Sequence, residues 1–81
     1  MKATEVSQRF VQSYYSLVGL RIVKTRSEFC KEIGIFPSTF SIISNGERLV
    51  TIEQLCKLNE RYNISFAWLF GESDKMFVNG N

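Results

Sequence analysis

The 81-residue sequence contains no histidine, one proline and two cysteines. Without histidine the chain lacks the commonest general base and the commonest metal ligand, and Cys30 and Cys56 alone cannot complete a zinc site. Carboxylate pairs, cysteine–histidine dyads and glycine-rich phosphate loops are missing as well. We therefore expect no catalytic residues, no metal ligands and no cofactor, and hence no enzyme.

Long apolar runs are also absent from the sequence. No stretch approaches the ~18 consecutive apolar residues of a membrane-spanning helix, and the first residues show no apolar core of a signal peptide. One possible cysteine pair is too few for a disulfide-dense extracellular domain, which favours a reducing compartment. These absences predict a cytoplasmic protein with no membrane partner, and no small-molecule ligand is evident.

What is present is the composition of one folded domain. Hydrophobic residues make up 44% of the chain and charged residues 22%, which is typical of globular proteins. Ten lysines and arginines against eight acids leave a net charge of +2, so bulk charge alone does not indicate a nucleic-acid partner. Any basic surface must come from cationic side chains that cluster locally.

Apolar residues recur at spacings of three and four along most of the chain, which predicts helices. Gly34 is suited to a left-handed C-cap and Pro37 to a first helical turn, while Thr51 with Gln54 forms a capping box. The seven phenylalanines, three tyrosines and one tryptophan supply a core. We therefore predict an all-α fold, a compact bundle of five helices, after which residues 72–81 fray. The expected helices run from Thr4 as N-cap to Gly19, from Thr25 or Ser27 to Gly34, from Pro37 or Ser38 to Ser44, from Thr51 to Asn63, and from Ser65 to Gly71.

Residues 26–44 carry the most informative pattern. A small residue, Cys30, stands where two helices must cross closely, and Gly34 occupies a turn four residues later. Phe40 and Ile43 then supply the inward-facing pair of the next helix. This arrangement resembles the helix-turn-helix of phage-repressor-like transcriptional regulators, the lambda repressor-like or XRE family.

The resemblance extends over about residues 10–72. Residues 42–48 resemble the turn after the family's recognition helix, residues 51–58 its fourth helix, and residues 63–72 the Trp-Leu and Gly-Glu ending of bacterial and prophage members. The resemblance implies a five-helix lambda repressor-like DNA-binding domain over residues 1–72. Residues 73–81 would then be a C-terminal tail or the start of a linker.

On this resemblance, residues 37–44 form the recognition helix, and its N-terminal residues face base edges. Hydroxyl groups there can bind either base type, and Ile42 can contact a thymine methyl. Family members often carry glutamine near position 37 and arginine near position 42, and this chain has neither. Shape, phosphate contacts and dimer spacing are therefore expected to carry more of the specificity. The candidate base-contact residues are Pro37, Ser38, Thr39, Ser41 and Ile42.

Cationic residues gather before and along the second expected helix, where they could bind the DNA backbone. Arg26 is the strongest candidate, because the family grips a phosphate at the start of this helix. The alternative is a solvated face whose cations are balanced by Glu28, Glu32 and Glu47. The candidate phosphate-contact residues are Arg21, Lys24, Arg26, Lys31, Ser44, Asn45 and Arg48.

The last expected helix is dense in apolar residues. It either completes the core or forms a dimer surface, because small repressors often pair through this helix. Buried packing is the favoured interpretation of both thiols, with redox sensing as the alternative. The candidate dimer-interface residues are Phe66, Trp68, Leu69 and Phe70.

Two classes of function remain open on these grounds. The first is a sequence-specific transcriptional regulator, a repressor that binds double-stranded DNA at a palindromic operator as a homodimer. The second is a protein-binding adaptor or antitoxin-like module that keeps the fold without the DNA function. Pro37 and Ile42 have no polar side chain that could hydrogen-bond to a base. For this reason the second class stays open.

Overall fold

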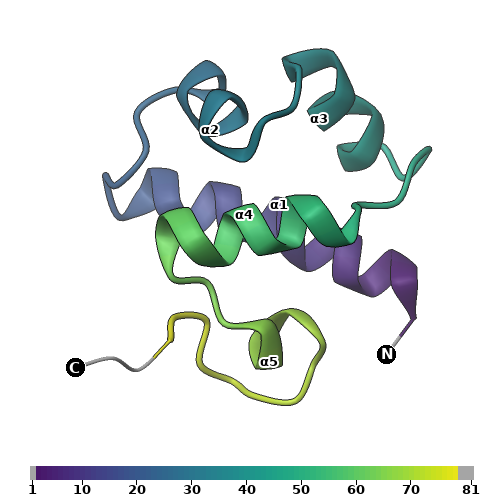
Figure 1. Ribbon diagram of the computed structural model, residues 1–81, viewed down its shortest axis with the longest axis vertical. Helices are drawn as coiled ribbons and strands as arrows, with labels where there is room; N and C mark the ends of the chain where they lie inside the picture. Colours follow the sequence, from purple (N-terminus) through teal and green to yellow (C-terminus); the bar gives the residue numbers. More distant parts are fainter. Residues whose placement is uncertain (1, 79–81) are drawn as a thin grey trace.

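Five helices make up the computed structural model, which describes residues 2–78 (Figure 1). This confirms the all-α fold class predicted from the spacing of apolar residues. The helices are α1 (Ala3–Gly19), α2 (Arg26–Ile33), α3 (Pro37–Ser44), α4 (Ile52–Tyr62) and α5 (Phe66–Leu69).

Most helix ends lie where local signals placed them. The Thr25 hydroxyl caps α2 by accepting a hydrogen bond from the backbone N–H of Glu28 at 3.1 Å. At the start of α4, the Thr51 hydroxyl accepts from the Gln54 backbone N–H and the Gln54 side chain accepts from the Thr51 N–H, at 3.2 and 2.9 Å. The Ser65 hydroxyl caps α5 in the same way. These caps satisfy amide groups that the helices themselves leave unpaired.

The first helix begins earlier than expected. Its N-cap is Lys2, so Thr4 lies inside the first turn and the prediction of Thr4 as N-cap is wrong. Glu5 explains the difference, because its carboxylate accepts a hydrogen bond from the Lys2 backbone N–H at 2.9 Å. A negative charge in the first turn also interacts favourably with the helix dipole.

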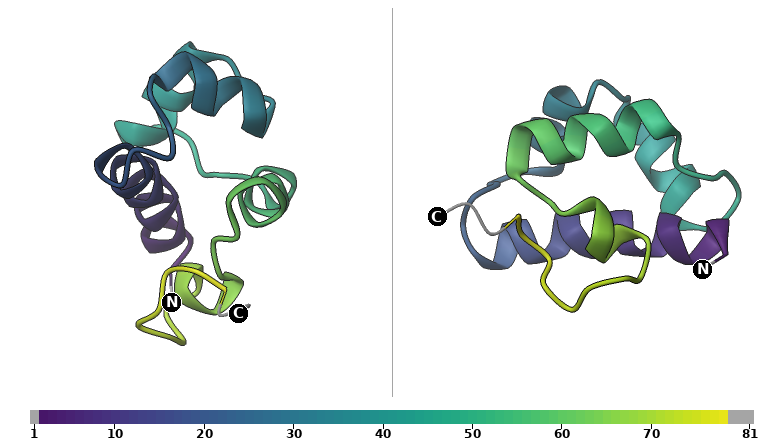
Figure 2. Two further views of the ribbon diagram at one scale, coloured as in Figure 1. Left: turned by 90° about the vertical axis from the view of Figure 1, so that its left-hand side faces the viewer. Right: turned by 60° about the horizontal axis from the view of Figure 1, so that its bottom comes forward.

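The helices form layers that can be followed in Figures 1 and 2. The α2–α3 pair lies on one side of α1 and α4, and α5 lies on the opposite side. Helix α2 packs against α3 and α4, while α1 packs against α3 and α5. The long helix α1 therefore connects the layer that contains the helix-turn-helix candidate with the end of the domain.

An aromatic cluster joins the first three helices. Phe10, Phe29 and Phe40 are fully buried, with ring centroids 5.8 to 6.2 Å apart. The Tyr14 ring meets both Phe29 and Phe40 edge-on, with centroids 5.1 Å apart. Such pairs contribute about 0.5–1.5 kcal/mol each beyond the burial of area. The cluster thus fixes α2 and α3 relative to α1.

The segment after α5 returns to the domain. Ile64 and Phe77 form an isolated antiparallel bridge, and the Ser65 N–H donates to the Met76 carbonyl at 2.7 Å. Met76 and Phe77 also pack against the core. The expectation of fraying from residue 72 is therefore wrong as far as Val78, while the expectation for residues 79–81 lies outside the described residues. The domain boundary at residue 72 stays a prediction.

Candidate nucleic-acid interface

A tight turn connects α2 to α3. Gly34 follows α2 with φ of 84°, a left-handed conformation that glycine adopts without steric cost, and its N–H donates to the Cys30 carbonyl at 2.8 Å. The Cys30 side chain is 1% exposed, and burial raises the pKa of its thiol. Pro37 then occupies the first turn of α3. Only three residues separate the two helices, so the orientation of α3 is set by the turn and by the core.

Helix α3 has one apolar face and one polar face. Phe40 and Ile43 are buried against the aromatic cluster and α1. Pro37 and Ser38 are exposed, while Thr39, Ser41 and Ile42 are half-buried. All five candidate base-contact residues thus keep some accessible surface. The outer face offers hydroxyl groups and apolar carbon and carries no charge.

Phe36 is a conspicuous surface residue that the sequence pattern did not single out. It is the N-cap of α3, and its side chain is 76% exposed and makes no capping hydrogen bond. The signal was present in the sequence, because the position before Pro37 is where serine, threonine, aspartate or asparagine normally stands. Phe36 therefore presents an aromatic ring at the N-terminal tip of α3.

The cationic candidates lie around the α2–α3 pair. Arg21, Lys24 and Lys31 are exposed on the loop before α2 and on α2 itself, and Arg48 is exposed after α3. Residues 20–25 and residues 45–51 form loops at opposite ends of the pair (Figures 1 and 2). Most of the cationic candidates thus lie before or along α2, and Arg48 lies at the other end of the pair.

Arg26 differs from the other cations because it packs on aromatic rings. Its guanidinium carbon lies 5.0 Å from the centroid of Phe40 and 5.7 Å from that of Tyr14. Both distances are within the range of a cation–π interaction. Arg26 therefore holds the start of α2 against α1 and α3, in addition to exposing charge beside α3.

The nearby acids have partners of their own. A Glu28 carboxylate oxygen accepts a hydrogen bond from the Lys24 backbone N–H at 3.2 Å, at the N-terminus of α2. Among residues 2–78, the one ion pair within 4.0 Å joins Glu32 to Arg61, at 3.8 Å between Oε1 and Nε. Both side chains of this pair are about half exposed, so it contributes little to stability. Neither acid neutralises Lys24 or Lys31 by direct pairing.

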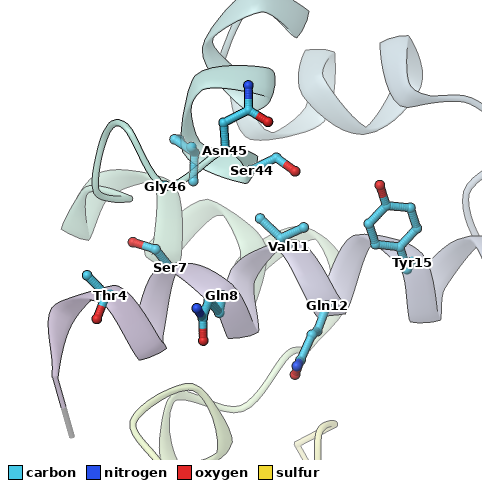
Figure 3. Close-up of a pocket in the computed structure, with 10 residues that line it drawn as sticks. Thr4, Ser7, Gln8, Val11, Gln12, Tyr15, Ser44, Asn45 and Gly46 are labelled. Carbon is cyan, nitrogen blue, oxygen red and sulfur yellow. The ribbon is translucent and has the colours of Figure 1, made fainter.

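A groove runs between α1 and the C-terminal end of α3 (Figure 3). Its volume is about 470 Å³, and Ser44 and Asn45, both candidate phosphate contacts, form one wall. The opposite wall consists of α1 side chains that the sequence pattern did not single out. No lining residue of this α1–α3 groove carries a charge. The α1 residues that line it are Thr4, Ser7, Gln8, Val11, Gln12 and Tyr15.

The structure corrects the dimer-interface assignment for two residues. Leu69 is fully buried and Trp68 is 7% exposed, so both belong to the core of a single chain. Arg9 covers Trp68: its Nη1 donates to the Trp68 carbonyl at 2.8 Å, and its guanidinium lies 5.0 Å from the ring centroid. Phe66 and Phe70, each 39% exposed, stay accessible to a second chain.

A second groove, of about 270 Å³ and lined by apolar residues, lies beside Phe70. Leu49 and Ile52 line it and are 47% and 68% exposed. Together with Phe70 they form an apolar patch, named here the 49–52–70 patch. Neither Leu49 nor Ile52 was a sequence candidate, because the loop before α4 and the first residue of α4 come together with the end of α5 only in the folded domain.

Within residues 2–78, no cluster of three or more cysteine, aspartate or glutamate side chains is placed to hold a metal ion. None of the helices in the same range is long and apolar enough to cross a membrane. Comparison of the chain with protein-family models, with curated proteins and with solved structures found no match. The resemblance to phage-repressor-like regulators therefore stays a prediction.

Proposed function

We propose that this chain is a sequence-specific DNA-binding regulator, a repressor that binds a palindromic operator in bacterial or prophage DNA as a homodimer. The observation that supports this most strongly is the polar outer face of α3. Two buried residues, Phe40 and Ile43, hold the helix on the core, while Ser38 is left exposed. A helix presented in this way fits the major groove, which is about 12 Å wide.

The cations support the same proposal. Arg21 and Lys24 lie on the loop at one end of the α2–α3 pair and Arg48 on the loop at the other, where they would meet phosphates on both sides of a major groove. Asn45 and Ser44 add neutral hydrogen-bonding groups at the C-terminal end of α3. These contacts would position α3 without specifying sequence.

The 49–52–70 patch supports the homodimer part of the proposal. Leu49, Ile52 and Phe70 expose apolar surface around a groove, and a second copy of the chain would cover it. Two recognition helices would then lie about 34 Å apart in successive major grooves. Ile52→Glu should dissociate the dimer in analytical ultracentrifugation, and the same change should weaken binding to a palindromic site.

A salt titration tests the proposal directly. A fluorescent duplex of mixed sequence, about two helical turns long, is titrated with the protein at several salt concentrations. Each phosphate neutralised by a cation should contribute about −0.9 to the slope of log K against log salt. Arg48→Ala should reduce this slope and weaken binding to all sequences, whereas Ser38→Ala should act mainly on preferred sites selected from random DNA. No binding at low salt would refute the proposal.

The second candidate function is a protein-binding adaptor or antitoxin-like module. The 49–52–70 patch is also the observation that favours it, because an exposed apolar groove can hold a side chain of another protein. Recovery of no preferred site from random DNA, together with monomeric behaviour of the purified chain, would favour this function over the first.

A further inference from the structure

Phe36 exposes the largest fraction of any large hydrophobic side chain among residues 2–78, at 76%. It stands at the N-cap of α3, directly before Pro37, in the turn between the buried residues Ile33 and Phe40. An aromatic ring with this exposure buries little area in the fold. Its contribution to the packing of the domain is therefore small.

The position itself is suited to a different residue. The backbone of Phe36 has φ of −80° and ψ of 149°, and its carbonyl accepts the first helical hydrogen bond from Phe40 at 3.1 Å. This is the ordinary N-cap geometry, in which a serine hydroxyl would accept a hydrogen bond from an amide of the first turn. Phenylalanine makes no such bond. The chain thus has neither a side-chain cap nor a polar surface residue at this position.

Contact with a molecule outside the chain would explain why the Phe36 ring is exposed. The tip of a recognition helix is the part that approaches base edges, and the apolar feature of the major groove is the thymine C5-methyl group. Phenylalanine is one of the side chains suited to contact this methyl group. The neighbouring Ser38 offers a hydroxyl that binds any base, so it cannot supply this discrimination.

We infer that Phe36 reads a thymine methyl group in the major groove, next to the bases faced by Ser38. This inference rests on the proposed function and names the base that α3 selects. It also explains how α3 can specify sequence without a long polar side chain at positions 37 and 42. Apolar contact at the helix tip then supplies the selectivity for thymine, beside the hydrogen bonds that the Ser38 hydroxyl makes to the neighbouring bases.

The test uses the duplex that the wild-type chain selects most strongly from a random library. Each thymidine in that duplex is replaced in turn by deoxyuridine, which removes only the C5-methyl group. Binding of wild type and of Phe36→Ser is measured by fluorescence anisotropy at fixed salt. For wild type, loss of the contacted methyl group should weaken binding about fourfold at each half-site.

Phe36→Ser should remove this sensitivity, so thymine and uracil at that position should bind equally well. The same variant should be more stable than wild type, with Tm raised by about 4 to 8 °C, because serine caps α3. Weaker DNA binding in a more stable protein cannot be attributed to misfolding. Phe36→Leu, which keeps apolar surface without a cap, should retain most of the sensitivity to the methyl group.

Leu20→Ser serves as the matched control, since Leu20 is 57% exposed but follows α1 and lies outside the α2–α3 pair. It should leave the response to uracil unchanged. The inference is overturned if Phe36→Ser keeps the wild-type response to uracil, or if it weakens binding to every duplex alike. If the wild-type chain selects no duplex at all, both the proposed function and this inference are overturned.

Discussion

The interaction of Arg26 with two aromatic rings leads to a quantitative prediction about stability. Its guanidinium lies over Phe40 and Tyr14, and partly exposed cation–π contacts are each worth about 0.5–1 kcal/mol. Arg26→Met keeps a flexible apolar side chain but removes the charge. We therefore expect the free energy of unfolding to fall by about 1–2 kcal/mol.

Thermal and urea unfolding, followed by far-UV circular dichroism, measure this loss. For a domain of this size, about 1 kcal/mol corresponds to a decrease in Tm of roughly 4–8 °C. Lys24→Met is the matched control, because Lys24 is an exposed cation two residues earlier that lies over no ring among the described residues. The control should melt close to wild type.

A double-mutant cycle separates the cation–π contact from other effects of the charge. Phe40→Leu alone disturbs the core, but its cost should be smaller in the Arg26→Met background, because the contact is already gone. The expected coupling is about 0.5–1 kcal/mol. Additive costs for Arg26 and Phe40, or an Arg26→Met variant as stable as the Lys24→Met control, would refute the role assigned to Arg26.

Three further predictions concern single residues: Tyr62, Cys30 and Gln12. Tyr62→Phe should leave stability unchanged or raise it by up to about 1 kcal/mol in urea unfolding, because the Tyr62 hydroxyl is buried without a hydrogen-bond partner while its ring stacks on Phe29. Burial raises the pKa of the Cys30 thiol, so the folded state holds that proton more tightly than the unfolded state. The contribution of Cys30 to the free energy of unfolding should therefore be constant below pH 9.0, the ordinary pKa, and fall above it. Cys30→Ala should make the loss of stability above this pH less steep in urea unfolding. Gln12→Lys, which adds a charge to the α1 wall of the α1–α3 groove, should strengthen DNA binding and steepen the salt slope by about 0.9. An unchanged slope would place the groove away from the DNA backbone.

Local sequence signals were sufficient to predict the helices. Gly34, Pro37 and the Thr51–Gln54 capping box act through backbone geometry and through hydrogen bonds three or four residues apart, so the sequence alone contains the relevant partners. The first helix was placed less accurately because Thr4 and Lys2 compete as N-cap. Glu5 decides this competition through a hydrogen bond to the Lys2 N–H.

Contacts between distant segments could not be predicted in the same way. The segment around Phe77 pairs with Ile64, and its single bridge has too few residues to show an alternating strand pattern. The 49–52–70 patch likewise combines a loop residue, the first residue of α4 and the end of α5. An apolar residue in such a segment has the same sequence pattern whether it is buried or exposed. Only the fold therefore shows that Leu69 is buried and that Phe70 is partly exposed.

The same limit applies to the charged residues and bears on the proposed function. Arg9 and Arg26 look like the other cations in the sequence, yet each is held over an aromatic ring by helix packing. The packing of α1 against α5 places Arg9 over Trp68, and the packing of α2 against α3 places Arg26 over Phe40. An arginine fixed in this way loses less conformational freedom when it meets a phosphate, because its side chain is already ordered. Arg26 therefore combines a structural contact with a pre-ordered charge beside α3, whereas Lys24, which is exposed and lies over no ring among the described residues, would have to be ordered on binding.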